Sequence, residues 1–313
     1  MSLQFMAERG HTEMTLDAQQ RAGAAENQLA RAQRWRRVQR FWTSLVRQRN
    51  IMVGGALLLL VICCAVFASI LATHNPQQIE VLSRLQPPSA EFFFGTDQQG
   101  RDVYSRVLYG ARLSLSVGFT VALATVVLGT LIGLVAGFYN RADAVIMRVM
   151  DGMMAFPSII LAIGIMAARG ASSANVVLAL TIVGIPGLVR LVRSVVLSMR
   201  ETQFVEAAQA VGNPDWRILW RHILPNTFSP LIVQTTYIFA VAVLSEATLS
   251  FLGAGAPPEE PSWGVMLNDA RSVLQQAPWA VFFPGAAITL TVFSLNLLGD
   301  GLRDMLDPQL RQR

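Results

Sequence analysis

The 313-residue chain has no lysine, because all 25 of its basic residues are arginine. The phosphate-binding loop G-x-x-x-x-G-K-[ST] needs a lysine ammonium to reach the phosphates of a nucleotide. The chain therefore lacks an ATP site of that kind. A process that uses ATP would need another subunit to bind it.

Histidine and cysteine are also scarce. The three histidines, His11, His74 and His222, are far apart in the sequence, and no H-E-x-x-H motif is present. Cys63 and Cys64 are adjacent inside an apolar run, which is typical of small packing residues. A membrane hydrolase using Ser and Asp is an open alternative, although no G-x-S-x-G turn supports it. We predict no catalytic residue, no metal site and no cofactor bound by this chain.

Apolar residues are abundant instead. They make up 53% of the chain, against 14% charged residues, which is too apolar for an ordinary soluble domain. A membrane-spanning helix needs about 20 apolar residues. The first apolar run is late and long enough to span, so we expect it to remain in the mature chain. The sequence predicts an all-α, multi-pass membrane protein with six transmembrane helices, at 51–73, 113–138, 146–168, 175–196, 229–252 and 279–298.

The arginines predict the orientation of these spans, since positive residues in short flanking segments stay on the cytoplasmic side. With the N-terminus inside, all but six arginines are cytoplasmic, and both termini lie on that side. The net charge of +5 is then a topology signal, and no motif indicates nucleic-acid binding. The six arginines on the outer side are Arg84, Arg101, Arg106, Arg112, Arg169 and Arg271.

These predictions divide the chain into five parts. The N-terminal tail, residues 1–50, contains Trp35, Val38, Trp42 and Leu45 at three- and four-residue steps among arginines. This spacing predicts an amphipathic helix on the inner leaflet, and the alternative is a frayed tail that only sets topology. The other parts are the first span at 51–73, an extracytoplasmic loop at 74–112, a transmembrane core at 113–298 that contains the segment 201–225, and a cytoplasmic tail at 299–313.

A polar segment, residues 201–225, separates the fourth and fifth spans. It predicts a helix over 201–211, a stop at Gly212, and a second helix with Asn213 as N-cap, Pro214 at the first position and Asp215 in the first turn. This helical hairpin either lies on the membrane surface or projects as a docking element. The predicted apolar faces are Phe204, Ala207, Ala208 and Val211 on the first helix, and Trp216, Leu219, Trp220 and Ile223 on the second.

Three parts of this hairpin, Glu206-Ala207-Ala208, Gly212 and Leu224-Pro225, resemble the EAA loop of the membrane subunits of ABC importers. The chain departs from the family pattern at His222, where an apolar residue is usual. The resemblance implies that the hairpin couples to an ATPase subunit that binds ATP and Mg. An alternative is that Glu206 only decorates a solvated helix face. The residues assigned to ATPase coupling are Glu206, Ala207, Ala208, Gly212, Pro214, Asp215, Trp216, Leu224 and Pro225.

Segments 94–118, 245–271 and 297–311 resemble the second permease of dipeptide and oligopeptide importers. The resemblance implies the type I ABC importer permease fold in a bacterial inner membrane. It also implies three kinds of partner: a homologous permease forming a heterodimer, two ATPase subunits, and an extracytoplasmic binding protein that delivers peptides. Glutathione and nickel complexes are alternative cargoes. The residues carrying the outer resemblance are Gly95, Thr96, Asp97, Gly100, Arg101 and Asp102, of which the charged ones could simply tie the loop to itself.

Glu246 is an acidic residue inside the fifth predicted span, where an unpaired carboxylate is costly. Counting along the helix puts it near the outer mouth of the path. There it serves either as an outer gate or as an anchor that reaches the outer interface. Further candidates for the translocation path are Gln234, Thr235, Thr236 and Tyr237.

Small residues and prolines predict how the spans pack. Gly129, Gly133 and Gly137 form a stripe that allows close helix approach, and Pro157, Pro186 and Pro284 predict bends. Two rivals to the importer are a secondary, ion-coupled transporter and a scaffold that binds an ATPase without transport. The first would need midplane acidic groups and usually internal repeats, and neither is evident in the sequence.

Overall fold

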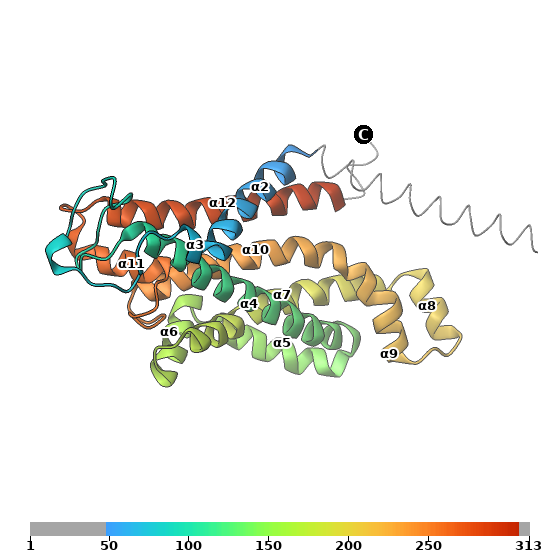
Figure 1. Ribbon diagram of the computed structural model, residues 1–313. Coiled ribbons are helices and arrows are strands. Elements are labelled where there is room, and N and C mark those ends of the chain that lie inside the picture. The colour runs from blue at the N-terminus through green and yellow to red at the C-terminus, as the bar shows by residue number, and fades with distance from the viewer. Residues whose placement is uncertain (1–47, 307–313) are drawn as a thin grey trace, which may run out of the picture. The chain divides into compact units, whose positions relative to one another are not determined.

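The computed structural model describes residues 48–306. The chain divides into two units, Met1–Arg49 and Asn50–Arg313, and the elements below belong to the second unit apart from the first residue of α2. The predicted interfacial helix at 31–47 falls outside the described residues. Within 48–306 the structure is helical, with a single isolated β-bridge between Thr96 and Asp102 (Figure 1).

Eleven α-helices are described over this range. Five of them are long and apolar enough to cross a membrane, counting the helical run Asp215–Phe251 as one. The helices are α2 (Arg49–Val66), α3 (Ala68–Leu71), α4 (Val103–Phe138), α5 (Asn140–Met154), α6 (Ser158–Arg169), α7 (Ser173–Arg200), α8 (Gln203–Ala210), α9 (Asp215–Ile218), α10 (Leu224–Phe251), α11 (Trp263–Ala270) and α12 (Trp279–Leu306). Shorter turns are η1 (Val81–Ser83), η2 (Leu219–Ile223) and η3 (Arg271–Val273).

The third predicted span, 146–168, is not one straight helix. It is divided between α5 and α6, which meet at an angle of 89°. Pro157 lies at the break and precedes α6, so the predicted bend at this proline is confirmed. Proline has no amide hydrogen and its ring clashes with the preceding turn, which ends α5 here. The pair counts as a sixth span only if both helices are taken together.

Close packing of α4 against α7 uses the predicted glycine stripe. A Cβ atom placed on Gly129, Gly133 or Gly137 would lie 2.8 Å from Leu188 Cδ2, 2.7 Å from Val192 Cβ and 2.5 Å from Val196 Cβ, respectively. The absence of side chains on α4 therefore lets the two backbones approach, as in other membrane helix pairs. The predicted packing role of the stripe is confirmed.

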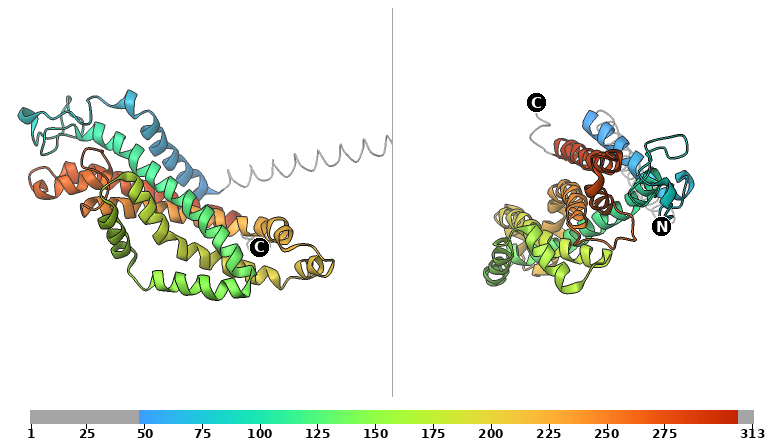
Figure 2. Two further views of the ribbon diagram at one scale, coloured as in Figure 1. Left: turned by 90° about the horizontal axis from the view of Figure 1, so that it is seen from below. Right: turned by 90° about the vertical axis from the view of Figure 1, so that its left-hand side faces the viewer.

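The loops sort to the two ends of the long helices (Figures 1 and 2). The hairpin formed by α8 and α9 lies at one end, while the segment between α3 and α4 and the helix α11 lie at the other. The start of α2 and the end of α12 lie at the hairpin end. The last helix also runs past its predicted end at 298, as far as Leu306, so part of the predicted tail is helical. We call the end with α8 and α9 the hairpin end, and the end with α11 the loop end.

Candidate functional site

The hairpin between α7 and α10 is more continuous than predicted. Its first helix, α8, is separate, but the second helix runs from Asp215 to Phe251 as one helical segment through α9, η2 and α10. The η2 segment is a π-helical turn just before Pro225, whose missing amide hydrogen removes a bond to the preceding turn. The second hairpin helix and the fifth span are therefore one element.

Gly212 makes the turn. Its φ of 80° lies in the left-handed region, which glycine adopts without steric cost. The amide of Gly212 donates to the Gln209 carbonyl and that of Asn213 to the Ala208 carbonyl, which closes the end of α8. The prediction of a glycine stop is confirmed. The predicted N-cap is wrong by one residue: Pro214 occupies that position, and Asp215 opens the helix.

The inner face of the hairpin packs against the helix bundle. Val205, Ile218 and Ile223 are fully buried and join a core cluster with residues of α4 and α7, such as Leu134 and Val196. The predicted apolar faces are therefore partly wrong. Val205 and Ile218, which were not predicted to be on these faces, are buried in the core. Of the residues predicted to be on them, only Ala208 and Ile223 are buried. The exposed ones include Phe204, Ala207, Trp216 and Trp220.

Four large apolar side chains of the hairpin are exposed. Val211 is 83% exposed and Trp216 is 61% exposed, and Phe204 and Trp220 are exposed as well. Soluble surfaces seldom leave such large apolar side chains together without a partner. We call Phe204, Val211, Trp216 and Trp220 the hairpin patch. The predicted coupling residues Glu206, Ala207, Pro214 and Pro225 are also exposed, whereas Leu224 is half-buried.

Polar contacts hold the hairpin to the end of α4. Asp215 of α9 acts on Tyr139 at the end of α4: desolvation, followed by the interaction with the Asp215 carboxylate, raises the pKa of Tyr139. At the end of α7, the Arg200 Nη1 donates to the Gly137 carbonyl at 3.2 Å and to Asn140 Oδ1 at 3.0 Å. His222, which departs from the family pattern, lies 6.3 Å from Phe204 between ring centroids.

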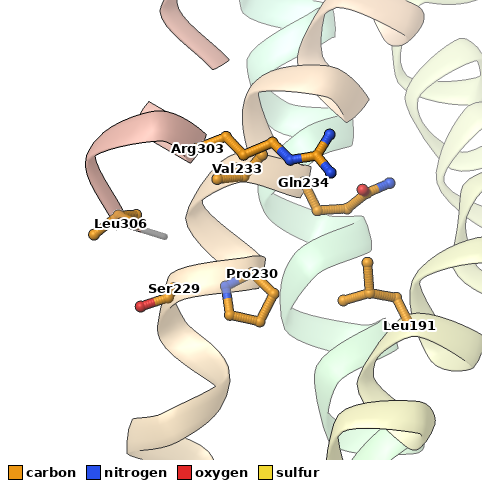
Figure 3. Close-up of a pocket in the computed structure, with 7 residues that line it drawn as sticks. All are labelled: Leu191, Ser229, Pro230, Val233, Gln234, Arg303 and Leu306. Atoms are coloured by element: carbon orange, nitrogen blue, oxygen red, sulfur yellow. The ribbon is translucent and has the colours of Figure 1, made fainter. Parts of the chain in front are cut away.

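Two cavities follow one another along the groove between α7 and α10. The one nearer the hairpin has a volume of about 440 Å³ and includes Leu191, Pro230, Gln234 and Arg303. Figure 3 shows the Arg303 guanidinium above the amide of Gln234. The next cavity, of about 210 Å³, is lined by Gln234 again and by Tyr237. We call this the α7–α10 groove.

The other predicted path residues lie elsewhere. Thr235 and Thr236 donate to the carbonyls of Leu231 and Val233 within α10, and Thr236 also contacts Gly299 of α12. Neither threonine lines the two cavities of the groove.

Glu246 is fully buried, with 0% exposure. Its carboxylate accepts hydrogen bonds from Ser114 Oγ at 3.0 Å and Ser250 Oγ at 2.8 Å. Because no part of Glu246 reaches the surface of this chain, the expectation that it extends to the outer interface is wrong. Glu246 does not line the cavities of the α7–α10 groove either. In this structure it joins α10 to α4.

The outer segment with the family resemblance is tied to a distant helix as well as to itself. Asp97 Oδ2 accepts from Arg101 Nε at 2.7 Å, and Asp102 caps α4 by accepting from the Ser105 amide at 3.0 Å. Gly95 and Gly100 have φ of 72° and 77°. Thr96 is fully buried. The sequence missed Asp269 of α11, which pairs with Arg101 from 168 residues away.

A family described as "Binding-protein-dependent transport system inner membrane component" matches residues 111–312. The chain belongs to this family of permeases. A second family, described as the "N-terminal TM domain of oligopeptide transport permease C", matches residues 36–88 of the permease. As a multi-pass membrane subunit of an ABC importer, the permease has its EAA segment at 206–208 on the hairpin.

Several relatives resemble the permease over most of their length. A putative peptide transport system permease of Brucella suis is 49% identical over 85% of this chain and 90% of that protein. The dipeptide transport system permease DppC of Alkalihalophilus pseudofirmus is 46% identical over 91% and 93%. The glutathione transport system permease GsiD of Pectobacterium atrosepticum is 43% identical over 87% and 91%.

The fold also resembles a solved structure. The inward-facing MetNI methionine ABC transporter matches with a TM-score of 0.53 at 18% identity, over 64% of this chain and 96% of that chain. At this identity the similarity concerns the fold. It agrees with the fold class inferred from the sequence, an ABC importer permease built of apolar helices.

Proposed function

We propose that the permease imports short peptides through a path that it forms with a homologous permease, and that two ATPase subunits drive it by gripping the hairpin patch. An extracytoplasmic binding protein delivers the peptides, and the complex lies in the bacterial inner membrane. ATP and Mg are bound by the ATPase subunits, and this chain has no catalytic site of its own.

The hairpin patch is the observation that carries this proposal. Its four large apolar side chains are exposed. The helices α8 and α9 that carry them lie at the hairpin end (Figure 1), where the positive-inside distribution of arginines predicts cytoplasm. Exposed apolar surface in water is stabilised when a partner covers it. The inner face of the same hairpin is anchored by Ile218 and Ile223, so a partner that moves the patch also moves α10.

The assigned coupling residues share the hairpin with this patch. Glu206 is exposed on α8, and its carboxylate can pair with a cation of the partner. Ala207 is small and exposed, which permits close approach of another surface. An ATPase can shift the permease between conformations only if its contacts differ between them; moving an equilibrium from 1:99 to 99:1 needs about 5.5 kcal/mol of differential binding.

Peptide cargo is supported by the relatives. Those at 42–49% identity are named for peptide, dipeptide, or di- and tripeptide transport. Glutathione, the named cargo of another relative, is itself a peptide. Glutathione and nickel complexes are the alternative cargoes. Either cargo would contact the α7–α10 groove.

A secondary transporter would need an acidic group for its coupling ion. Glu246 is the one acidic residue in the fifth predicted span, and its oxygens already accept bonds from two serines. Asp151, in the third predicted span, is already paired with Arg190. We therefore favour the ATP-driven mechanism. Uptake by the isolated chain in vesicles with an ion gradient and no ATP would support the rival.

The decisive experiment removes the large side chains of the patch and, separately, disrupts the coupling residues. In the assembled complex, Trp216→Ala with Trp220→Ala should weaken attachment of the ATPase subunits by more than tenfold and abolish ATP-dependent uptake of a dipeptide. Glu206→Lys and Gly212→Pro should have the same effect while membrane insertion is retained. The matched control is Phe293→Ala on α12, which removes an equally exposed aromatic ring far from the hairpin. Normal ATPase copurification and uptake in all of the hairpin variants would refute the proposal.

A further inference from the structure

Two ion pairs join α5 to α7. Arg190 Nη2 donates to Asp151 Oδ1 at 2.6 Å, and Arg193 Nη2 donates to Asp143 Oδ2 at 2.6 Å. We call them the outer-lying pair, Arg190–Asp151, and the hairpin-side pair, Arg193–Asp143.

The outer-lying pair is at membrane depth. With 1.5 Å per residue, the 28 residues of α7 span about 42 Å, and Arg190 lies about 15 Å from the end of the helix at Arg200. The predicted span 175–196 ends six residues after Arg190, about 9 Å along the helix. Arg190 is therefore inside the predicted span.

The outer-lying pair is nevertheless open. The Arg190 side chain is 45% exposed and that of Asp151 is 57% exposed, against 31% and 22% for Arg193 and Asp143. Charged side chains in a bilayer avoid lipid and face a bundle interior or a water-filled cavity. The face that carries Arg190 and Asp151 is thus turned to water or to another subunit.

This face is continuous with the α7–α10 groove. Gly187, one helical turn before Arg190, lines the smaller cavity together with Ser158, which follows Asp151 across the α5–α6 bend. On α10 the same cavity is lined by Gln234 and Tyr237. Arg190 therefore lies one helical turn from the smaller cavity on α7, and we call this stretch of surface the strip.

We propose that Arg190 and Asp151 are a recognition pair for the two charged ends of a zwitterionic peptide in the translocation path. The Arg190 guanidinium takes the terminal carboxylate, and the Asp151 carboxylate takes the terminal ammonium. A planar guanidinium binds a carboxylate with two parallel hydrogen bonds. This inference rests on the proposed function, because it assigns the cargo-facing residues of that transporter.

The open pair suits this exchange. An exposed ion pair contributes about 0–1 kcal/mol, so it opens at little cost when a peptide supplies replacement charges. No bare charge is left in the apolar layer in either state. The hairpin-side pair is more enclosed and keeps α5 on α7 while the outer-lying pair is open.

The first test uses blocked peptides. The complete transporter is reconstituted with its binding protein, and initial uptake rates are measured for a free dipeptide, its C-terminal amide and its N-acetyl form. Arg190→Gln should lower the free-acid to amide rate ratio about tenfold relative to wild type, the effect of one lost charge-assisted hydrogen bond. Asp151→Asn should lower the free-amine to N-acetyl ratio similarly. Preferences of the binding protein cancel, since the same binding protein is present in every comparison.

The matched controls are Arg193→Gln and Asp143→Asn, which break the hairpin-side pair on the same two helices. They should leave both ratios at the wild-type value. If Arg190→Gln and Asp151→Asn slow all three peptides by the same factor, the outer-lying pair is a structural tie or a contact with the other permease, and the inference fails. If wild-type complex imports no peptide at all, the proposed function fails instead.

The second test measures whether water reaches the strip. Gly187 and Gly285 are both helical glycines with no atom within 4 Å of an added Cβ, so each accepts a cysteine. With Cys63 and Cys64 replaced by alanine, a charged, water-soluble thiol reagent should label Gly187→Cys and spare Gly285→Cys, which lies among Phe282 and Phe293. Labelling should fall at least threefold with saturating dipeptide and binding protein. Failure to label Gly187→Cys in the transporting complex would overturn the inference.

Discussion

Arg101 donates from Nη2 to Asp269 Oδ2 at 2.6 Å, joining the segment before α4 to α11. Arg106 also reaches Asp269, at 3.2 Å, and lies 3.8 Å from Asp97. Two arginines and two aspartates thus form one network at the loop end. Because Arg101 and Arg106 are almost completely buried, the network stabilises the loop end only while every charge has its partner.

We predict that Asp269→Ala strongly destabilises the permease. The change leaves two buried guanidinium groups with one acidic partner, and breaking a buried ion pair costs about 3–5 kcal/mol. The thermal unfolding temperature of the purified complex should fall by several degrees. Asp304→Ala on α12, an exposed aspartate, is the control and should leave unfolding unchanged. An unchanged unfolding temperature for Asp269→Ala would mean that the network has no stabilising role.

A substitution in the glycine stripe should separate α4 from α7. An added Cβ at Gly133 meets Val192 Cβ at 2.7 Å and the Val189 carbonyl at 3.1 Å, so Gly133→Ala overpacks the contact and should cost about 1–3 kcal/mol. Gly152→Ala on α5 meets open space and should be neutral or stabilising by up to about 1 kcal/mol. Denaturation in detergent compares the two variants, and equal stabilities would contradict the packing argument.

The backbone conformation at Gly212, and not the space around it, should decide which residues the hairpin turn accepts there. No atom lies within 4 Å of a Cβ on Gly212, yet its φ is 80°. Gly212→Ala should therefore cost about 1–2 kcal/mol, and Gly212→Asn less, because asparagine enters the left-handed region more easily. Protease nicking within the hairpin measures the local effect. Equal nicking of wild type and Gly212→Ala would argue that the turn relaxes without strain.

The contribution of Glu246 to stability should come from its hydrogen bonds more than from its charge. Glu246→Gln keeps the size of the side chain and one acceptor, so the bonds to Ser114 and Ser250 can be partly retained. Glu246→Leu leaves the two buried hydroxyls without their acceptor, at about 1–3 kcal/mol each. The unfolding temperature should fall further for Glu246→Leu than for Glu246→Gln. The reverse order would show that an apolar side chain fits this site better.

Local chemistry explains which features could be predicted from the sequence. Three features follow from the residue type alone: the turn at Gly212, the break at Pro157, and the close packing at Gly129, Gly133 and Gly137. Glycine has no side chain and a freer backbone, and proline lacks an amide hydrogen, in any sequence context. The helix α4 begins at Val103, ten residues before the predicted start of the second span at 113, and Asp102 caps it from within its own segment. The family resemblance rested on such local strings.

Other features depend on distant parts of the chain. The 89° bend at Pro157 has an amplitude set by packing on α7, and a proline by itself indicates only a break. The faces of the hairpin were misjudged because helical spacing alone does not tell whether Val205 or Phe204 meets α4. Asp269 was missed because nothing near it in sequence marks its partner 168 residues away. Glu246 was recognised as unusual, but its serine partners come from other turns and another helix.

The unbroken run from Asp215 to Phe251 has a mechanical consequence. At 1.5 Å per residue its 37 residues make a lever about 55 Å long, with the hairpin patch at one tip and the Glu246–Ser114 bond towards the other. The helical run continues through its π-helical turn, so its two ends belong to one element. A displacement at the hairpin is therefore carried along this helix toward the Glu246–Ser114 bond, apart from what bending at the π-helical turn before Pro225 takes up.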